Sequence, residues 1–399
     1  MIRDKLRAVA ASAPRTYWYV WWGTLVNRLG GFVAPLLMIY LTTQRRLAVD
    51  DAGAIVMWFG AGQVAASIAG GQLTDRVGRR TTMLISLFGG AIVMVALGRA
   101  RGLTEITGLV AALGFVGELY RPAVFAFVAD VVPPASRLVA FGLLYWAINL
   151  GFAVAASLGG LVADYDFSIL FYVDAATTFL FAALIAFKVP ETRPTTAPRR
   201  VNSPSVSPLL DVQFMILATL SLLGSIVLMQ EGATLSAHMM WQGFSASTYG
   251  FVLAVNGILI VVLQPLLTRW SGTRDPSRLL ALSVLLYGIA MFAHGIAPIA
   301  LAHAGAVAIW TLGEVLESPV KASIVADMAP PSARGRYQGT LVMTWGLAQM
   351  IGPRLGTWLW VHEGPAVVWN GSLGVAIVVA LLYLMTGPAL RRRLGARTG

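Results

Sequence analysis

Residues 117–137 read GELYRPAVFAFVADVVPPASR, and residues 313–334 read GEVLESPVKASIVADMAPPSAR. Both stretches contain Gly-Glu, an internal proline, Val-Ala-Asp, a Pro-Pro pair and a final arginine, in the same order. Asp130 and Asp327 stand 197 residues apart, which is close to half the chain. Both stretches also carry charges inside an otherwise apolar sequence. The repeat predicts two related halves, and the charges require partners or a watery surrounding.

A second repeat supports this division of the chain. Residues 73–80 read LTDRVGRR, and residues 267–274 read LTRWSGTR, 194 residues later. In each half this shorter stretch would follow the second helix, and the longer stretch would form the fourth. Two parallel six-helix repeats are the arrangement in which two halves rock about a site at mid-membrane.

The composition places the chain in a membrane. Of its 399 residues, 57% are hydrophobic and only 12% are charged, whereas soluble domains keep about 25% charged. A membrane span needs about 20 apolar residues, and the two-residue alternation of a β-barrel is absent. We expect an all-α membrane protein with twelve transmembrane helices, near residues 16–43, 53–74, 81–99, 105–130, 138–163, 168–188, 212–240, 246–269, 278–297, 300–328, 337–361 and 366–388.

Several classes of function are disfavoured by what the sequence lacks. There is no cysteine and no Gly-rich phosphate loop, so thiolate chemistry and ATP hydrolysis are not expected. The four histidines, at positions 238, 294, 303 and 362, show no metal-ligand spacing. No nucleophile–base pair suggests an enzyme, and we expect neither a cofactor nor a metal.

The basic residues follow the positive-inside rule, by which Lys and Arg stay on the cytoplasmic side. Of the 29 basic residues, 21 fall in the termini and alternate loops, four in the opposite loops and four inside predicted spans. Both termini are therefore predicted to be cytoplasmic, which requires an even number of spans. The net charge of +11 is then a topology signal, and nucleic acid is not an expected partner.

The longest polar connection is residues 189–211, VPETRPTTAPRRVNSPSVSPLLD. It is basic and rich in Pro, Ser and Thr, which is typical of a flexible linker, and it can also rest on anionic lipid headgroups. The predicted organisation is an N-terminal six-helix bundle in residues 1–188, a cytoplasmic linker in 189–211 and a C-terminal six-helix bundle in 212–399.

The stretch GGQLTDRVGRR at residues 70–80 resembles the signature loop between the second and third helices of the major facilitator superfamily. That pattern, Gly-x-x-x-Asp-Arg-x-Gly-Arg-Arg/Lys, is filled here by Gly71, Asp75, Arg76, Gly78, Arg79 and Arg80. The copy in the second half is degraded, with Arg269 at the aspartate position. Within the superfamily, the sequence is similar to bacterial twelve-helix proton-coupled drug antiporters. Their Gly-Pro-x-x-Gly-Gly motif is only partly present, as SLGG at 157–160, and GPRLG at 352–356 lies in the other half.

The residues of this signature loop also have structural roles that follow from their own chemistry, without the resemblance. Gly71 lets two helices approach closely, Gly78 permits a tight turn, and Asp75 can accept hydrogen bonds from a neighbouring helix N-terminus. The arginines can bridge to Asp130 or to headgroups. The resemblance implies that this cluster latches the halves on the cytoplasmic side while the cavity opens outward. The alternative is that the charges of this loop only set the orientation of the chain in the membrane, and we favour this interpretation for Arg80.

Charged and polar residues lie deep in several predicted spans, where one charge costs about 2.5–3.5 kcal/mol on insertion scales. They are Asn27 and Arg28 in the first helix, Glu118 and Arg121 in the fourth, Glu231 in the seventh, Glu314, Glu317 and Lys321 in the tenth, and Arg354 in the eleventh. In the superfamily fold, the first, fourth, seventh and tenth helices line the cavity. The pairs Glu118–Arg121 and Glu317–Lys321 are spaced to meet on one helix face, so a purely structural role stays open for both.

Two kinds of candidate site residue follow. A carboxylate in an apolar wall favours its protonated form, because desolvation penalises the charge; we rank Glu231, Glu118 and Glu314, in that order, as carriers of a coupled proton. Aromatic residues at mid-depth can stack on a flat or cationic ligand, with ordinary packing as the alternative for each: Tyr120, Tyr145, Trp146, Trp310 and Trp345.

The sequence therefore predicts a secondary transporter that works by alternating access. We expect proton-coupled efflux of small amphipathic compounds by a monomer in a bacterial inner membrane, with a small molecule, protons and the lipid bilayer as partners. A dedicated carrier for a metabolite, peptide, sugar or lysophospholipid is the first alternative, and a transporter-like membrane sensor is the second. The few charges among Met, Trp and Leu favour a tolerant pocket, and no signalling domain is visible.

Overall fold

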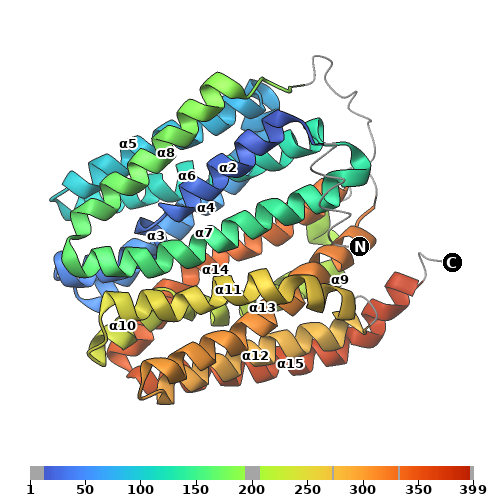
Figure 1. The fold of residues 1–399 in the computed structure, drawn as a ribbon. Coiled ribbons are helices and arrows are strands. Elements are labelled where there is room, and N and C mark those ends of the chain that lie inside the picture. Colours follow the sequence, from blue (N-terminus) through green and yellow to red (C-terminus); the bar gives the residue numbers. More distant parts are fainter. Residues whose placement is uncertain (1–12, 194–206, 272–273, 331–332, 396–399) are drawn as a thin grey trace.

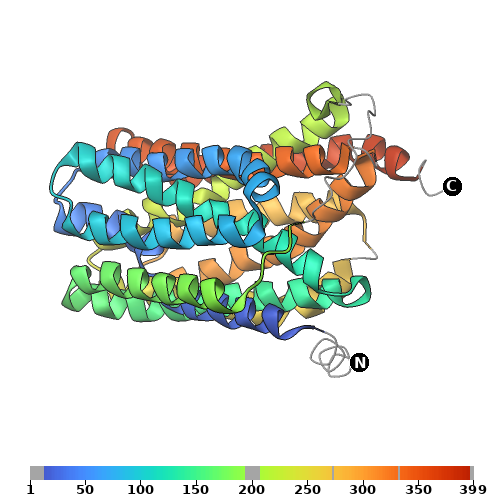
Figure 2. The same cartoon turned by 90° about the horizontal axis from the view of Figure 1, so that it is seen from above.

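The computed structural model describes residues 13–193, 207–271, 274–330 and 333–395. Within these ranges every regular element is helical, and the helices run side by side along one axis (Figures 1 and 2). The first and last helices begin and end at the same end of the bundle, which we call the terminal face, opposite the far face (Figure 1). The predicted linker lies largely outside the described residues, as do the first twelve positions with Arg3, Lys5 and Arg7.

The N-terminal half, residues 13–193, contains six membrane-length segments. The first consists of α2 (Arg15–Leu29), α3 (Val33–Ile39) and the π-helical turn η1 (Tyr40–Gln44). The other five are α4 (Val49–Val77), α5 (Arg79–Arg99), α6 (Leu103–Val131), α7 (Arg137–Tyr165) and α8 (Phe167–Lys188), with the short turn η2 (Pro134–Ser136) before α7.

The C-terminal half, residues 207–395, repeats this plan. Its first segment consists of α9 (Val212–Leu228), the turn η4 (Met229–Glu231) and α10 (Ala233–Trp241), after the short turn η3 (Pro208–Leu210). The other five are α11 (Ala246–Ser271), α12 (Pro276–Ile296), α13 (Ala300–Met328), α14 (Arg334–His362) and α15 (Pro365–Gly395).

Ten of these twelve segments are long and apolar enough to cross a membrane, among the residues that the structure describes. The other two, α13 and α14, have 29 residues each, which is also long enough at 1.5 Å per residue. They fall short in apolar character, since α13 carries Glu314, Glu317 and Lys321 and α14 carries Arg354. The predicted all-α membrane fold of two six-helix bundles is confirmed, while the side on which the termini lie stays a prediction.

The first segment of each half is interrupted, so the expectation of continuous helices over 16–43 and 212–240 is wrong. The N-terminal segment breaks at Gly30 after α2 and resumes at Val33, and the C-terminal segment breaks at Gly232, whose ψ is −97°. A broken helix exposes backbone groups that lipid cannot satisfy, so it survives only where protein or a cavity satisfies them. Asp174 does this in the first break, accepting from the Val33 amide at 3.3 Å.

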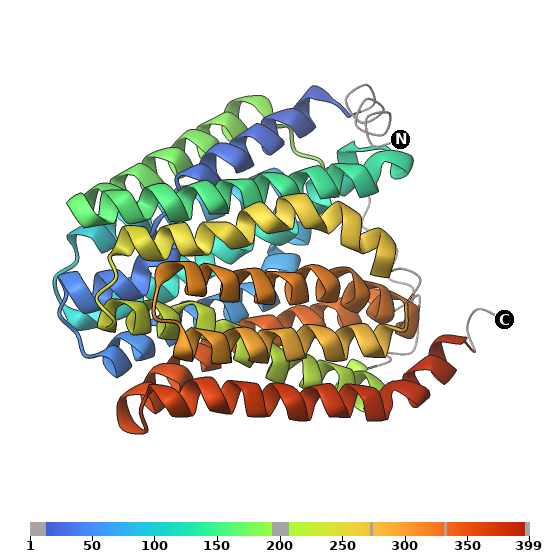
Figure 3. The same cartoon turned by 60° about the horizontal axis from the view of Figure 1, so that its bottom comes forward.

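The two halves touch near the far face through α4 against α14 and α7 against α11 (Figures 1 and 3). Glycines allow this contact: a Cβ on Gly250 would lie 2.1 Å from the Ala156 carbonyl oxygen, and one on Gly60 would lie 2.5 Å from the Gln349 backbone. Nearer the terminal face, a Cβ would meet nothing within 4 Å at Gly71, Gly142 or Gly339. The expected close approach at Gly71 is therefore not observed in this conformation, because these glycines border open space among the described residues.

At the terminal face, α15 is clamped to the start of α9. Arg393 donates to both carboxylate oxygens of Asp211, at 2.6 and 2.5 Å, and the Tyr337 hydroxyl donates to the same group at 2.7 Å. Asp211 also caps α9 through the Phe214 amide. Hydrogen bonds from Arg393 above all, and then from Tyr337 and the amide, outweigh burial and lower the pKa of Asp211 to about 2.

We expect Asp211→Asn to lower the free energy of unfolding by about 1 kcal/mol near neutral pH, because a near-surface charged hydrogen bond is lost. The unfolded carboxyl has a pKa of about 3.9. The contribution of Asp211 is therefore complete above that pH and disappears as the pH falls through about 2. The Tm difference between parent and variant in detergent should be constant from pH 7 to 5 and shrink below pH 4. A difference independent of pH would contradict this account.

Candidate transport site and gates

A polar cavity of about 170 Å³ lies in the N-terminal half beside the break in the first segment. Its wall contains Asn27, Arg28, Glu118, Tyr120 and Asp174. The Asn27 amide donates to Thr178 at 2.7 Å, and the Tyr120 hydroxyl shares a 2.7 Å hydrogen bond with Thr24. Four predicted site residues, Asn27, Arg28, Glu118 and Tyr120, thus come together in this wall, and Asp174 is an acid there that was not among the predicted candidates.

The pair Glu118–Arg121 meets as its spacing predicts, at 3.2 Å between Nη1 and Oε1. The Arg121 side chain is 56% exposed although it lies at mid-helix, so it faces an open space. Tyr145 on α7 is within electrostatic range of both Arg121 and Glu314. These two residues belong to different halves, so Tyr145 is influenced by charges of both halves.

Two acids of the C-terminal half lie within electrostatic range of each other, and one of them, Glu231, is at the second helix break. Glu231 is the last residue of η4, directly before Gly232, and its carboxylate has no hydrogen-bond partner among the described residues. Glu314 accepts a hydrogen bond from Asn256 at 2.9 Å and lies within electrostatic range of Glu231. Neither acid forms an ion pair in the described part of the chain. Such an acid pair can hold a proton or a cation.

Other predicted site residues lie away from this space. Glu317 and Lys321 form a 2.6 Å ion pair that is almost fully buried, and the Tyr287 hydroxyl donates to Glu317 at 2.9 Å. This pair lies between α12 and α13, which favours its structural reading. The Trp310 side chain is fully buried, which favours the packing alternative for this residue. Arg354 donates to the Asp50 carbonyl at 2.7 Å and so joins the halves near the far face.

The two remaining aromatic candidates differ in their surroundings. Trp146 is 37% exposed and stacks on Trp21 with ring centroids 6.5 Å apart, so one of its faces stays accessible. Trp345 is partly buried and packs against the apolar core. Of these two, Trp146 therefore has the more accessible ring for stacking on a ligand.

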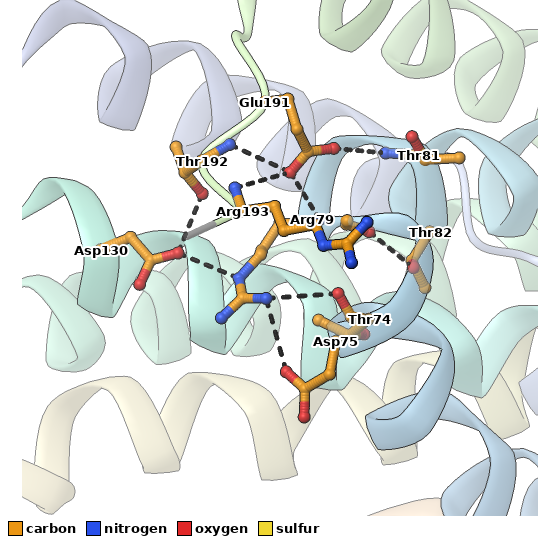
Figure 4. A network of polar contacts seen from close by, with 10 residues as sticks. Thr74, Asp75, Arg79, Thr81, Thr82, Asp130, Glu191, Thr192 and Arg193 are labelled. Atoms are coloured by element: carbon orange, nitrogen blue, oxygen red, sulfur yellow. Dashed lines mark hydrogen bonds and ion pairs between the residues drawn. The ribbon is translucent and has the colours of Figure 1, made fainter. Parts of the chain in front are cut away.

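The signature loop forms a network inside the N-terminal half (Figure 4). Arg79 donates to Asp130 at 3.0 Å and to Asp75 at 3.4 Å, and Thr192 donates to Asp130 at 2.9 Å. Arg80 donates to the Ala186 carbonyl at 2.6 Å, and Arg76 is exposed. The Asp75 side chain is 77% exposed, and it accepts a hydrogen bond from Arg79 but from no helix N-terminus among the described residues.

Glu191 completes this network, although the sequence analysis did not single it out. Its carboxylate accepts hydrogen bonds from the backbone amides of Arg79, Thr81, Thr192 and Arg193, at 2.8 to 3.3 Å (Figure 4). Partial burial raises its pKa, but these hydrogen bonds outweigh burial and leave the pKa below its usual value. Gly78 makes room for the carboxylate, with φ at +108° and Glu191 where a Cβ would stand.

We expect Asp75→Asn to change the free energy of unfolding by no more than about 0.5 kcal/mol, because Asp75 is exposed here. Expression and Tm should therefore stay close to those of the parent. Transport should nevertheless slow at least several-fold, since the loss would act on the conformation in which Asp75 meets the other half. Arg392→Gln, which also removes one exposed charge at the terminal face but lies outside the signature loop, is the matched control and should transport like the parent. Normal turnover of the Asp75 variant in proteoliposomes would reduce the loop to a topology signal.

A second set of contacts joins the halves near the far face. Asp164, close to the end of α7, accepts from the backbone amides of Ala246 and Ser247 at 3.1 and 3.2 Å. These amides open α11, where the helix dipole favours a negative charge. Together with Arg354 and Asp50, this cap closes the molecule at the far face. Asp164 was missed because nothing in the sequence shows that a helix N-terminus lies opposite.

Comparison with known proteins agrees with this geometry. The family model described as Major Facilitator Superfamily matches residues 20–242 and 213–399. The chain belongs to the Major Facilitator Superfamily. The uncharacterized MFS-type transporter YttB of Bacillus subtilis (strain 168) is 28% identical over 374 residues, covering 91% of this chain and 90% of that protein. The protein is a multi-pass membrane transporter of this superfamily and not an enzyme.

Two further relatives carry more specific names. The multidrug resistance protein MdtH of Proteus mirabilis (strain HI4320) is 27% identical over 372 residues, covering 88% of this chain and 90% of that protein. A Na(+), Li(+), K(+)/H(+) antiporter of Planococcus maritimus is 25% identical over 390 residues, covering 88% and 91%. Among solved structures, a POT family transporter in complex with 5-aminolevulinic acid superposes with a TM-score of 0.83 at 16% identity, covering 94% of this chain and 97% of that one. This last similarity shows the fold alone.

Proposed function

We propose that the protein exports small amphipathic compounds in exchange for protons, as a monomer in a bacterial inner membrane. The observation that carries the proposal is Glu231, an acid without a partner at a helix break, beside Glu314. An acid without a counter-charge at mid-membrane costs free energy, and its presence there points to a functional role. Its neighbour offers a second carboxylate, so a proton or a cationic group can be held between them.

The proposed cycle uses both gates. With the terminal face towards the cytoplasm, as the basic residues predict, the separation at Gly71, Gly142 and Gly339 is the state that admits a compound from inside. A cationic compound would displace the proton from the acid pair. Closure at the signature loop and opening at the Asp164 cap would then release it outside, where a proton replaces it. The division into bundles 1–188 and 212–399, joined by residues 189–211, belongs to this proposal.

The names of two relatives support this proposal and indicate the main alternative to it. The MdtH relative is a multidrug resistance protein, and the Planococcus relative exchanges alkali cations for protons. An acid pair without a basic partner suits an organic cation as well as a metal cation. The partly open aromatic face of Trp146 favours the organic one, because alkali ions are held by oxygen ligands and gain little from an indole at this depth.

The test uses purified protein in liposomes with an imposed pH difference, after reporter fusions near residues 102 and 395 have fixed the orientation. A cationic dye, a neutral dye of similar shape, a dipeptide, Na⁺ and K⁺ are offered in turn. We expect uphill movement of the cationic dye that collapses with the pH difference. Movement of Na⁺ or the dipeptide alone would replace drug export by the corresponding alternative, and no proton dependence for any compound would refute the coupling.

A further inference from the structure

Three of the four histidines, which show no pattern in the sequence, lie together in the C-terminal half near the far face. His238 is on α10, His294 is near the end of α12, and His303 is near the start of α13. All three side chains are at most 2% exposed. In the described residues, no group of three or more His, Cys, Asp or Glu side chains could hold a metal ion. The cluster therefore needs another explanation.

The hydrogen bonds fix which nitrogen carries each proton. Gln242 donates its amide to the Ala297 carbonyl at 3.0 Å, so its oxygen faces the His303 Nε2 at 2.9 Å and accepts from it. The Nδ1 of His303 is then an acceptor, and the His294 Nδ1 donates to it at 2.8 Å. The Nε2 of His294 is left as a bare, buried acceptor without a partner in the structure.

The surroundings offer no charge to balance a protonated histidine. The rings packed on the cluster are Trp241 at the end of α10, Phe244 after it, Trp310 on α13, Trp360 on α14 and Trp369 on α15. The titratable groups that face one another here are the three histidines themselves, within the part of the chain that the structure describes. An imidazolium in this place would be a buried charge without a counter-ion.

The cluster holds α10 in place. Gln242 ends this helix and ties it to the loop after α12, while Trp360 of α14 donates to the His238 Nδ1 at 3.4 Å. At its other end α10 begins at the break of Gly232, directly after Glu231. Across the interface it packs on α3 and α4 of the other half. The short helix α10 therefore lies between the break at Gly232 and the histidine cluster, and it is part of the far-face closure.

We propose that the histidine cluster is a proton-binding site that locks α10 while neutral and releases it when a proton arrives from the far face. The bond that forms is N–H at the free Nε2 of His294, and the proton comes from water on that side. In the locked state the resulting imidazolium has neither water nor a counter-ion, whereas in the opened state water solvates it. The opened state thus binds the proton more tightly, and by linkage a lower pH on the far face favours opening.

This inference rests on the alternating access of the proposed function, but it is tested without transport. The chain contains no cysteine, so a single introduced thiol reports its own accessibility. Ala237→Cys places it on α10, where the parent residue is 5% exposed, and Leu103→Cys supplies an exposed far-face reference. Labelling both with a membrane-impermeant maleimide and taking the ratio of rates cancels the pH dependence of the thiol itself.

We expect the ratio to rise as the far-face pH falls from 7.5 to 5.5, by at most about tenfold per pH unit for one proton. His294→Gln in the same background should remove the rise. His362→Gln is the matched control, because this fourth histidine is exposed and stacks on Trp358 away from the cluster, and it should keep the rise. If His294→Gln fails to fold, His303→Gln serves the same purpose.

Gln242→Glu tests the missing counter-ion directly. A carboxylate facing His303 would balance an imidazolium inside the locked state, so the rise should move to lower pH or vanish. A ratio that does not change with pH in the parent, or a rise that survives both histidine replacements, overturns the proposal. A rise abolished by a chelator would instead make the cluster a metal site. A flat ratio in a protein that still exports dye would defeat this inference alone and leave the proposed function standing.

Discussion

Glu231→Gln is expected to abolish proton-driven export while substrate exchange across the membrane persists. The amide keeps the size and hydrogen-bonding capacity of the carboxyl but stays neutral, so the site cannot take up and release a proton. A pH difference of one unit supplies about 1.4 kcal/mol per exchanged proton, enough for a tenfold concentration ratio of substrate. The parent should approach such a ratio, and the variant should stop at equal concentrations.

Glu118→Gln and Glu314→Gln are the comparison variants for this experiment. Glu118 already has Arg121 at 3.2 Å and Glu314 already has Asn256 at 2.9 Å, so each of these carboxylates has a partner of a kind that Glu231 lacks. Their variants should export more slowly but still uphill. The measurement is dye efflux from liposomes, with and without a pH difference, in parallel with counterflow exchange. If all three variants pump like the parent, these acids are structural and the coupling hypothesis is wrong.

Gly250→Ala is expected to shift the protein strongly away from the conformation described here. The new Cβ would stand 2.1 Å from the Ala156 carbonyl oxygen, a backbone atom that cannot move unless α7 and α11 separate. Overpacking of this kind costs about 1–3 kcal/mol, which corresponds to a shift of about 5- to 150-fold between two conformations. Because this contact exists only where the far face is closed, the opened state should gain.

The shift can be measured as the labelling rate of a far-face cysteine or as the distance between spin labels on α7 and α11. Gly160→Ala, whose Cβ would lie 2.5 Å from the Ala246 carbonyl oxygen, should act in the same direction. Gly374→Ala on α15 is the matched control, because its Cβ meets nothing within 4 Å and alanine is a better helix former than glycine. An unchanged distance in the Gly250 variant, with unchanged Tm, would show that the halves do not close by this contact.

The sequence by itself determined the class, the number of segments and their repetition. These properties follow from local hydrophobicity, because a chain in lipid must satisfy its backbone within each helix. The helix expected over 105–130 is observed as Leu103–Val131, and the one expected over 168–188 as Phe167–Lys188. Contacts between neighbours on one helix could also be predicted from the sequence. The pair Glu118–Arg121 is an example, because residues three apart lie on the same face of a helix.

Only the tertiary structure decided which faces of these helices meet. In a helix that is apolar all round, spacing does not reveal the buried side, and so stacking on a ligand and ordinary packing both stayed open for Trp310, which lies in the core. The breaks at Gly30 and Gly232, the cap of Asp164 on α11 and the histidine cluster all depend on residues far apart in the chain. Each of them is stable because another helix supplies a hydrogen-bond partner or excludes water, and such partners are chosen by packing across the bundle rather than by the local sequence.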